Sequence, residues 1–304
     1  MPILGTIASS FDEPAILGLF GGGDTTSMSN VIDYITIATT GNATDFGDLT
    51  VSRREVTGCA STTRGLFGGG YISANNNTID YVSVASAGNA ANFGSLTVAR
   101  GALAGCSSSS RGIFAGGLGT EDTIDYVTIA STGNATDFGN LTNGRNNICG
   151  SSSTTRGIFA NGNNGNDVNI IDYITIASTG NATDFGDTTV SRRSTVSCSS
   201  STRGLFAGGY RDTPAGMLNI IDYVTIATTG NTTDFGDLIA PKQLMGACSS
   251  SIRGVFGGGM ISGNSYSTGS EYVTIATTGN ATSFGDLTVG RWGVASLSNG
   301  HGGL

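Results

Sequence analysis

The sequence has few charged residues, a single histidine and only four prolines. Asp, Glu, Lys and Arg together make up 12% of the 304 residues, against about 25% in an average domain. The one histidine, His301, lies in the glycine-rich segment HGGL. General acid–base catalysis, a Ser/His/Asp triad and a histidine-ligated zinc or copper site all usually need a histidine that is held in a structured site and shielded from solvent. We therefore expect no catalytic residue, no metal site and no cofactor, and we expect that the protein is not an enzyme.

Long apolar runs and an excess of positive charge are also missing. No segment reaches the roughly 18 apolar residues that a membrane helix needs. The net charge of −8 makes nucleic acid or an anionic membrane surface a poor partner. The opening MPILGTIASSFDEP has no positive n-region and carries Asp12 and Glu13, so it does not read as a secretory signal peptide. We expect no nucleic acid, no membrane insertion and no secretion.

Glycine, in contrast, is abundant, and it falls in a repeating pattern. The 49 glycines are roughly double the usual share of about 7%, but there is no three-residue period of the collagen type. Three markers each occur six times, at intervals of about 47 residues, which is a period typical of propellers and helical arrays. They are the Phe of G-[LIV]-F-[GA] at Phe20, Phe67, Phe114, Phe159, Phe206 and Phe256, a Tyr at Tyr34, Tyr81, Tyr126, Tyr173, Tyr223 and Tyr272, and the Phe of F-G at Phe46, Phe93, Phe138, Phe185, Phe235 and Phe284.

Each repeat contains four short β-type segments and no helical period. In residues 53–97 these segments are EVTGCASS, RGLFGGG, TIDYVSVAS and ANFGSLT, which we name strands a, b, c and d. Each is short and is bounded by Gly, Asn or Ser. Four strands in about 47 residues form one propeller blade. The sequence predicts an all-β, six-bladed β-propeller over residues 16–304, with four antiparallel strands per blade and repeats starting near 17, 64, 111, 156, 203 and 253.

The unit resembles a kelch repeat over residues 17–297. It has a basic residue before strand a (Arg54, Arg100), a Gly-Gly pair after strand b (Gly69-Gly70), an acidic-Tyr pair in strand c (Asp80-Tyr81) and an aromatic residue in strand d. That last residue is Phe93, where kelch repeats usually carry Trp. The resemblance implies a propeller but no particular activity, because such propellers have many functions.

Strand a of the first blade can come from either end of the chain. The C-terminal GRWGVASLSNG spaces Arg291 and Leu297 as Arg100 and Cys106 are spaced, and the N-terminal ILGTIASS is the rival. We favour residues 291–298, because closure by the C-terminal strand pairs both ends of the ring and leaves no open edge. Residues 1–15 are then an attachment segment, whose apolar Ile3, Leu4, Ile7 and Phe11 are expected to dock on a partner.

The cysteines and the cations follow the repeat, which indicates structural roles. Cys59, Cys106, Cys149, Cys198 and Cys248 occur once per repeat in strand a, and we expect reduced thiols buried between blades. All but one of the 14 cations open strand a or strand b, and strand c carries the periodic acids Asp33, Asp80, Asp125, Asp172, Asp222 and Glu271. A ring of structural ion pairs or charge-assisted hydrogen bonds explains these residues, and a ring of arginines that binds an anionic ligand is the alternative.

Further recurring motifs fall in the turns. The sequons at Asn42, Asn134, Asn181, Asn231 and Asn280 are expected to be turn residues rather than glycosylation sites. Acid pairs such as Asp45 and Asp48 are interpreted as turn caps, with a calcium site as the alternative.

The b–c loops are the one place where the repeats differ strongly from one another. A propeller brings its b–c and d–a loops to one face, and a rigid scaffold with variable loops on one face is the usual design of a binding module. Relaxed constraint in surface loops is the alternative. The candidate binding residues in these loops are Asp24, Tyr71, Leu118, Tyr210, Met260 and Tyr266.

The opening MPILGTIASS is similar to the N-termini of structural proteins of marine bacteriophages, especially cyanophages. This resemblance implies a non-enzymatic virion structural or accessory protein, such as a capsid decoration or knob or a tail- or fibre-associated propeller, assembled in the host cytoplasm. Its expected partners are other virion proteins, bound through the N-terminal segment, and a host-surface glycan. The alternatives are a carbohydrate-binding adhesin and, third, an enzyme on the propeller scaffold.

Overall fold

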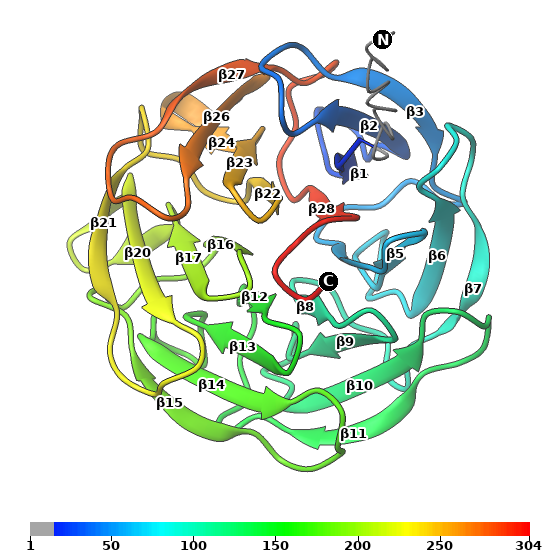
Figure 1. The fold of residues 1–304 in the computed structure, drawn as a ribbon, viewed down its shortest axis with the longest axis horizontal. Coiled ribbons are helices and arrows are strands. Elements are labelled where there is room, and N and C mark those ends of the chain that lie inside the picture. The colour runs from blue at the N-terminus through cyan, green and yellow to red at the C-terminus, as the bar shows by residue number, and fades with distance from the viewer. Residues whose placement is uncertain (1–14) are drawn as a thin grey trace, which may run out of the picture.

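The computed structural model describes residues 15–304, which form a ring of six four-stranded blades around a central axis (Figure 1). In the order a, b, c, d, the first three blades are β28 (Ala295–Ser298), β1 (Leu17–Gly21), β2 (Val31–Thr36) and β3 (Thr44–Asp48); β4 (Thr57–Ala60), β5 (Arg64–Gly68), β6 (Thr78–Ser83) and β7 (Ala91–Ser95); and β8 (Ala104–Ser107), β9 (Arg111–Ala115), β10 (Thr123–Thr128) and β11 (Thr136–Asn140).

The other three blades repeat the same order. They are β12 (Cys149–Ser152), β13 (Arg156–Ala160), β14 (Ile170–Thr175) and β15 (Thr183–Asp187); β16 (Val196–Ser199), β17 (Arg203–Ala207), β20 (Ile220–Thr225) and β21 (Thr233–Asp237); and β22 (Gly246–Ser249), β23 (Arg253–Gly257), β26 (Gly269–Thr274) and β27 (Thr282–Asp286). All pairings within the blades are antiparallel. The predicted six-bladed, all-β architecture is confirmed.

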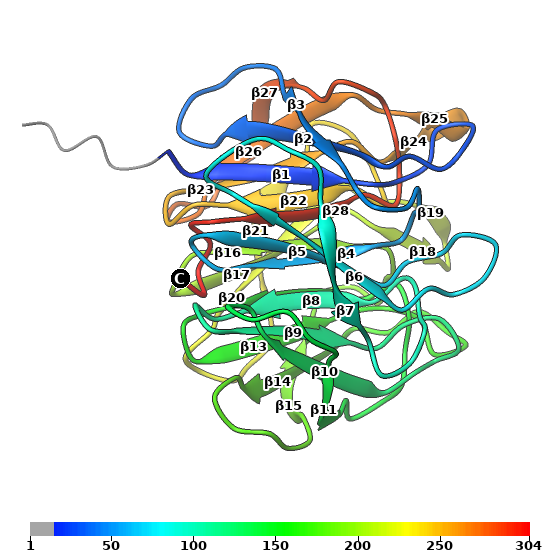
Figure 2. The same cartoon turned by 90° about the vertical axis from the view of Figure 1, so that its right-hand side faces the viewer.

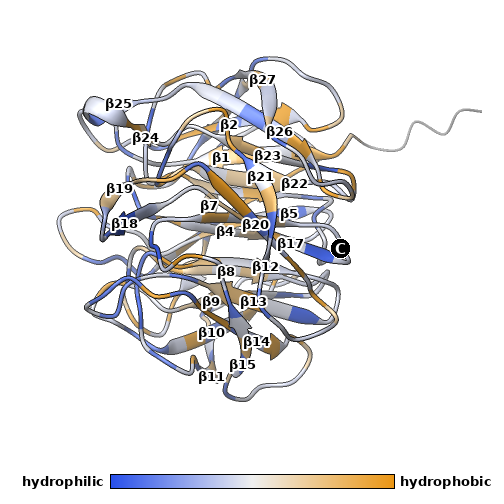
Figure 3. Cartoon of the chain, turned by 90° about the vertical axis from the view of Figure 1, so that its left-hand side faces the viewer, coloured by the Kyte–Doolittle hydropathy of each residue, from blue (hydrophilic) through white to orange (hydrophobic). Residues whose placement is uncertain are grey.

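Two b–c loops form small hairpins that project from one face of the ring. They are β18 (Tyr210–Asp212) with β19 (Ala215–Met217), and β24 (Met260–Ile261) with β25 (Ser265–Tyr266), the latter joined by the short 3₁₀ turn η1 (Ser262–Asn264). Figure 2 shows both hairpins on the side opposite the start of β1 and the C-terminus. In Figure 3 the projecting strand β18 is hydrophilic, whereas hydrophobic residues lie on blade strands such as β20.

The C-terminal strand closes the ring, as predicted. β28 pairs with β1 in the register Leu19↔Leu297, which matches Leu66↔Cys59 in the second blade. Because β1 takes β28 as its strand a, the first blade combines the two ends of the propeller. The rival segment ILGTIASS and the predicted attachment residues Ile3, Leu4, Ile7 and Phe11 lie outside the described residues.

The hydrophobic core is divided into six clusters, each between two consecutive blades. The phenylalanine of each strand b, represented by Phe67, is fully buried. The tyrosine of strand c meets the phenylalanine of strand d edge to face in every blade, as in Tyr34 and Phe46, whose ring centroids lie 5.9 Å apart. Burying such aromatic side chains supplies most of the packing energy of a sheet-on-sheet interface. All three sequence markers are therefore packing residues.

The predicted thiols are free, buried and packed between blades. The Sγ of Cys59 lies where a Cβ on Gly112 of the next blade would be only 2.7 Å away, so the glycine of the R-G motif leaves room for the thiol. Cys149 departs from this scheme, because Ser151 pairs with Ile158 at the position where Cys106 pairs with Ile113. Cys149 therefore lies two residues earlier on the strand, and the four other cysteines are the equivalent ones.

Each blade contains one buried ion pair between the strand a cation and the strand c acid. In the second blade, Arg53 Nη1 lies 2.9 Å from Asp80 Oδ2, with both side chains inaccessible to solvent, and Nη2 donates to the carbonyl of Phe67. The sixth pair is Lys242–Glu271 at 2.8 Å, in which the longer acid accompanies the shorter amine. The remaining pairs are Arg100–Asp125, Arg145–Asp172, Arg192–Asp222 and Arg291–Asp33. The structural interpretation of these charges is confirmed.

Periodic side chains also join consecutive blades on the face of the a–b and c–d turns. Arg64 Nη1 donates to the carbonyls of Ile129 (3.1 Å) and Ala130 (2.8 Å) in the next blade, and its guanidinium stacks on Tyr81. The equivalent clamps are Arg111, Arg156, Arg203 and Arg253. The first blade has Leu17 at this position, so the described part of the chain has five of these clamps.

The asparagines of the c–d turns are inter-blade contacts as well. Asn89 Oδ1, for example, accepts a hydrogen bond of 3.1 Å from the N–H of Asp48. The sequon residues Asn42, Asn134, Asn181, Asn231 and Asn280 make the same contact in their blades. Their recurrence thus has a structural cause beyond the turn itself.

Candidate functional site

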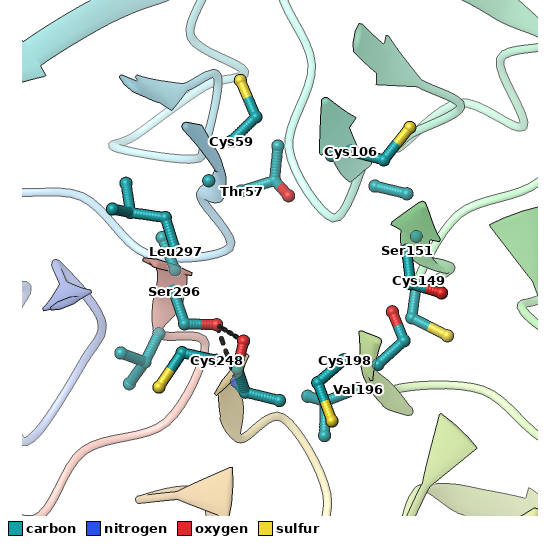
Figure 4. A pocket seen from close by; sticks show the side chains of 18 of the residues that line it. Thr57, Cys59, Cys106, Cys149, Ser151, Val196, Cys198, Cys248, Ser296 and Leu297 are labelled. Carbon is teal, nitrogen blue, oxygen red and sulfur yellow. Dashed lines mark hydrogen bonds between the residues drawn. The ribbon is translucent and has the colours of Figure 1, made fainter. Parts of the chain in front are cut away.

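The six strands a surround a central channel with a cavity of about 150 Å³. Figure 4 looks along this channel and shows the cysteine side chains pointing away from its middle, toward the blades. Strand a is the innermost strand of each blade, so one edge of its backbone faces the axis. The unpaired N–H and C=O groups of such an edge need partners.

At the end near the b–c loops, the backbone itself provides these partners as a closed ring. The N–H of Glu55 donates to the carbonyl of Gly293 (2.8 Å), and the N–H of Ala102 donates to the carbonyl of Glu55 (3.0 Å). The ring continues through Asn147, Ser194 and Leu244 and returns to Gly293. All six residues have positive φ between 53° and 64°, a conformation that residues other than Gly and Asn rarely adopt. The ring therefore fixes the diameter of the channel mouth.

At the opposite end, serine side chains form a second ring. Ser107 Oγ donates to the carbonyl of Ala60 (2.8 Å) and accepts from the N–H of Ala60 (3.0 Å), so one hydroxyl satisfies both groups of the neighbouring strand edge. The same contact is repeated by Ser152, Ser199, Ser249 and Ser298. Ala60 occupies the sixth position and has no hydroxyl.

The C-terminal residues close the channel at this serine end. His301 Nε2 lies 3.0 Å from Ser107 Oγ and 3.2 Å from the carbonyl of Ala60, while Nδ1 accepts from the N–H of Gly303. Because Nδ1 is an acceptor, the neutral imidazole carries its proton on Nε2. Burial lowers the pKa of His301 to about 4, and the bond to Ala60 opposes this shift. The lone histidine is therefore a structural plug residue.

Five of the six predicted binding residues lie at equivalent positions around the channel mouth. We call this set, with its partners from the d–a connections, the mouth ring. Tyr71, which directly follows the Gly69-Gly70 pair, forms a β-bridge with Arg54. The other five pairs are Asp24–Trp292, Leu118–Gly101, Asn163–Asn146, Tyr210–Arg193 and Met260–Gln243. Tyr266 lies outside this ring, opposite Met260 in the β24–β25 hairpin.

The mouth ring is most elaborate at the junction of the first and second blades. The Cζ of Arg54 lies 5.1 Å from the ring centroid of Tyr71 and 4.9 Å from that of Trp292, and its Nη1 is 2.7 Å from Asp24 Oδ2. Glu55 follows Arg54 and lines the channel. Burial raises the pKa of Glu55, with Arg54 lowering and Asp24 raising it by smaller amounts. We call Asp24, Arg54, Glu55, Tyr71 and Trp292 the seam cluster.

A simpler cluster lies three blades away. Arg193 stacks on Tyr210 at 5.0 Å and pairs with Asp167 (2.5 Å) and Asp212 (2.7 Å). These hydrogen bonds raise the pKa of Arg193. This cluster contains no tryptophan, and Ser194 stands at the position of Glu55, so it provides a matched comparison for the seam cluster.

The candidate residues of the b–c loops gather at one face of the ring, and Trp292 and Glu55, which the sequence did not single out, lie beside them. Aligning GRWGV with SRREV places Trp292 opposite Arg54 and Gly293 opposite Glu55, and this alignment is the signal for both. Within residues 15–304, no group of three or more His, Cys, Asp or Glu side chains is arranged to hold a metal ion. The same residues include no helix with the length and apolarity of a membrane span.

The sequence matches no family model, and comparison with curated proteins finds no similar sequence. The assignment of a function therefore rests on the residues of the ring itself.

Proposed function

We propose that this protein is a non-enzymatic, kelch-like virion protein of a bacteriophage, acting as a capsid decoration or as a tail- or fibre-associated module. In this proposal one face of the propeller is held on the particle and the b–c face contacts a partner protein or the host surface. Neither nucleic acid nor membrane insertion has a part in it.

The observation that carries the proposal is the difference between the two faces. On the a–b face, the side chains of Arg64 and its equivalents are engaged in inter-blade contacts. On the b–c face, the mouth ring presents a different pair of side chains in each blade. Leu17 begins β1 at the end opposite the b–c loops (Figure 2). A partner bound through the preceding residues would therefore leave the variable face free.

Two sequence features support the virion setting. The opening MPILGTIASS is similar to N-termini of cyanophage structural proteins, and the repeats are nearly identical, with few charged residues. Expression in the host cytoplasm agrees with five reduced, buried thiols, because disulfides are rare in that compartment.

The first test is whether purified virions contain this chain, and in what copy number. The second is deletion of residues 2–11, which should leave a folded propeller, judged by circular dichroism and thermal unfolding, that no longer assembles onto particles. A variant lacking residues 299–304 serves as the control, since it loses the channel plug but keeps the N-terminal segment. Normal assembly of the 2–11 deletion would show that the anchoring surface is elsewhere on the ring.

Carbohydrate binding is the second candidate function, and the aromatic residues of the mouth ring favour it. Tyr71, Tyr210 and Trp292 lie on the same face, beside carboxylate and guanidinium groups. Aromatic rings next to hydrogen-bonding groups offer both kinds of contact that sugars require. Glycan-array binding that is lost on replacing Tyr71 by alanine would support this function.

A further inference from the structure

The seam cluster differs from the rest of the mouth ring in chemistry, although its backbone follows the same six-fold plan. It combines the only tryptophan of the sequence, a tyrosine, a guanidinium and two carboxylates. The equivalent positions elsewhere hold mainly amide, aliphatic or glycine residues, such as Asn146, Gly101 and Met260. Ring closure requires the backbone at these positions but not these side chains.

The cluster is held in place before any ligand arrives. Arg54 lies between two aromatic rings and is tied to Asp24, so its long side chain has already lost its rotamer freedom. Such preorganisation lowers the entropic cost of binding. Tyr71 is also fixed, because its hydroxyl donates to the carbonyl of Ser73 (3.2 Å).

Hydrogen-bond acceptors at the cluster remain available. Arg54 forms its ion pair through Asp24 Oδ2, and within the described residues the carboxylate of Glu55 pairs with no cation. Glu55 lies beside two glycines, which place no side chain of their own against its carboxylate. A Cβ on Gly101 would lie 3.5 Å from Glu55 Oε2, and a Cβ on Gly293 would lie 3.6 Å from its Cγ. The equivalent of Gly101 in the next blade is Asn146.

The charges of the cluster limit the class of ligand. Two carboxylates repel phosphate, sulfate and other anions, and the guanidinium of Arg54 disfavours an approaching ammonium group. Neutral molecules with many hydroxyl groups avoid both costs. Hydroxyls donate to carboxylates in charge-assisted hydrogen bonds, and the C–H face of a sugar ring packs on aromatic surface.

From these observations we propose that the seam cluster is the binding site for a neutral glycan, with Glu55 and Asp24 accepting sugar hydroxyls and Trp292 and Tyr71 forming the apolar wall. This site rests on the proposed role of the b–c face as the binding face, and it assigns that role to one junction of the ring. The cluster built on Arg193 and Tyr210 is not the glycan site, because it lacks both the tryptophan and the unpaired channel acid.

The test uses the full-length chain and the fluorescence of Trp292, which reports on this cluster alone because it is the single tryptophan. The probes are neutral oligosaccharides of glucose, galactose, mannose and N-acetylglucosamine. At least one is expected to change the emission saturably. Glu55→Gln and Asp24→Asn should each weaken that binding about tenfold or more, the effect of losing a hydrogen bond to a charged group. Tyr210→Ala should bind as the wild type does.

Thermal unfolding of each variant separates lost binding from lost folding. The proposal is wrong if no oligosaccharide changes the emission, or if Glu55→Gln and Asp24→Asn, folded as the wild type, bind with unchanged affinity. It is also wrong if a lysine-rich peptide, and no sugar, saturates the signal, since that outcome would assign the cluster to a cationic partner. Virion assembly of the 2–11 deletion tests the proposed function separately, because that experiment does not involve the b–c face.

Discussion

The plug at the serine end of the channel should open as His301 is protonated. The imidazole accepts a hydrogen bond at Nδ1 from Gly303 and lies against Ser107 and Ala60 through Nε2. Protonation of Nδ1 removes that acceptor and places a charge where the strand edges and serine hydroxyls offer no anion. The titratable groups of the surrounding strands a are the thiols of Cys59, Cys106, Cys149, Cys198 and Cys248, which are neutral at these pH values because burial raises their pKa.

The sign and size of the effect follow from the lowered pKa. A pKa of about 4 in place of 6.5 corresponds to roughly 3 kcal/mol in favour of the neutral form. Because the residue keeps some contact with solvent, we expect about 1–2 kcal/mol. When the plug is open, the imidazole of His301 is exposed and binds a proton more tightly than it does in the closed plug. The stabilisation of the closed plug is therefore fully present above pH 6.5 and is lost as the pH falls toward 4.

The measurement is an NMR titration of the imidazole Cε1–H signal, which is unambiguous in a chain with one histidine. We expect a midpoint near pH 4 in the wild type. Ser107→Ala removes a hydroxyl beside the Nε2–H and makes the site less polar, so its midpoint is expected at or below that of the wild type. A wild-type midpoint near 6.5 would mean that the imidazole of His301 is exposed to water, and His301 would then not close the channel.

Three further predictions concern the ring. Deleting residues 290–304 removes β28 and the Arg291–Asp33 pair, so the melting temperature should fall sharply. Deleting residues 299–304 keeps both and should have a much smaller effect. Equal melting temperatures for the two deletions would contradict closure by β28. The five buried thiols should resist a thiol reagent without denaturant. Burial keeps them protonated and therefore unreactive, and it raises the pKa of Cys59 and Cys198 to about 12. Rapid stoichiometric labelling of the native protein would show that the thiols are accessible. Replacing Arg100 by methionine leaves Asp125 buried without its cation and should lower the free energy of unfolding by about 3–5 kcal/mol. The same replacement at Arg111, a partly exposed clamp, should cost about 1 kcal/mol, and denaturant titrations showing equal losses would contradict this ranking.

Much of this protein could be predicted from its sequence, because each blade solves the same packing problem. The phenylalanine before each Gly-Gly pair, the tyrosine of strand c and the F-G of strand d must recur wherever blades stack alike, and their spacing indicated six units of four strands. The pairing of periodic cations with periodic acids was foreseen for the same reason. The b–c loops stood out because their sequences differ from repeat to repeat, since loops that do not pack between blades are free to vary.

The tertiary structure decided what happens at the axis and at the seam, where residues distant in sequence meet. The backbone ring through Glu55 and Gly293 and the ring of serine hydroxyls exist only once six strand edges surround one channel, and no single repeat contains either. The plug depends on a contact between His301 and Ser107, 194 positions apart, so the sequence showed only a lone histidine in a glycine-rich tail. Trp292 and Asp24 come together because closure of the ring brings the last strand beside the first. Local periodicity determines the repeated contacts, whereas the contacts that occur once depend on how the ring closes.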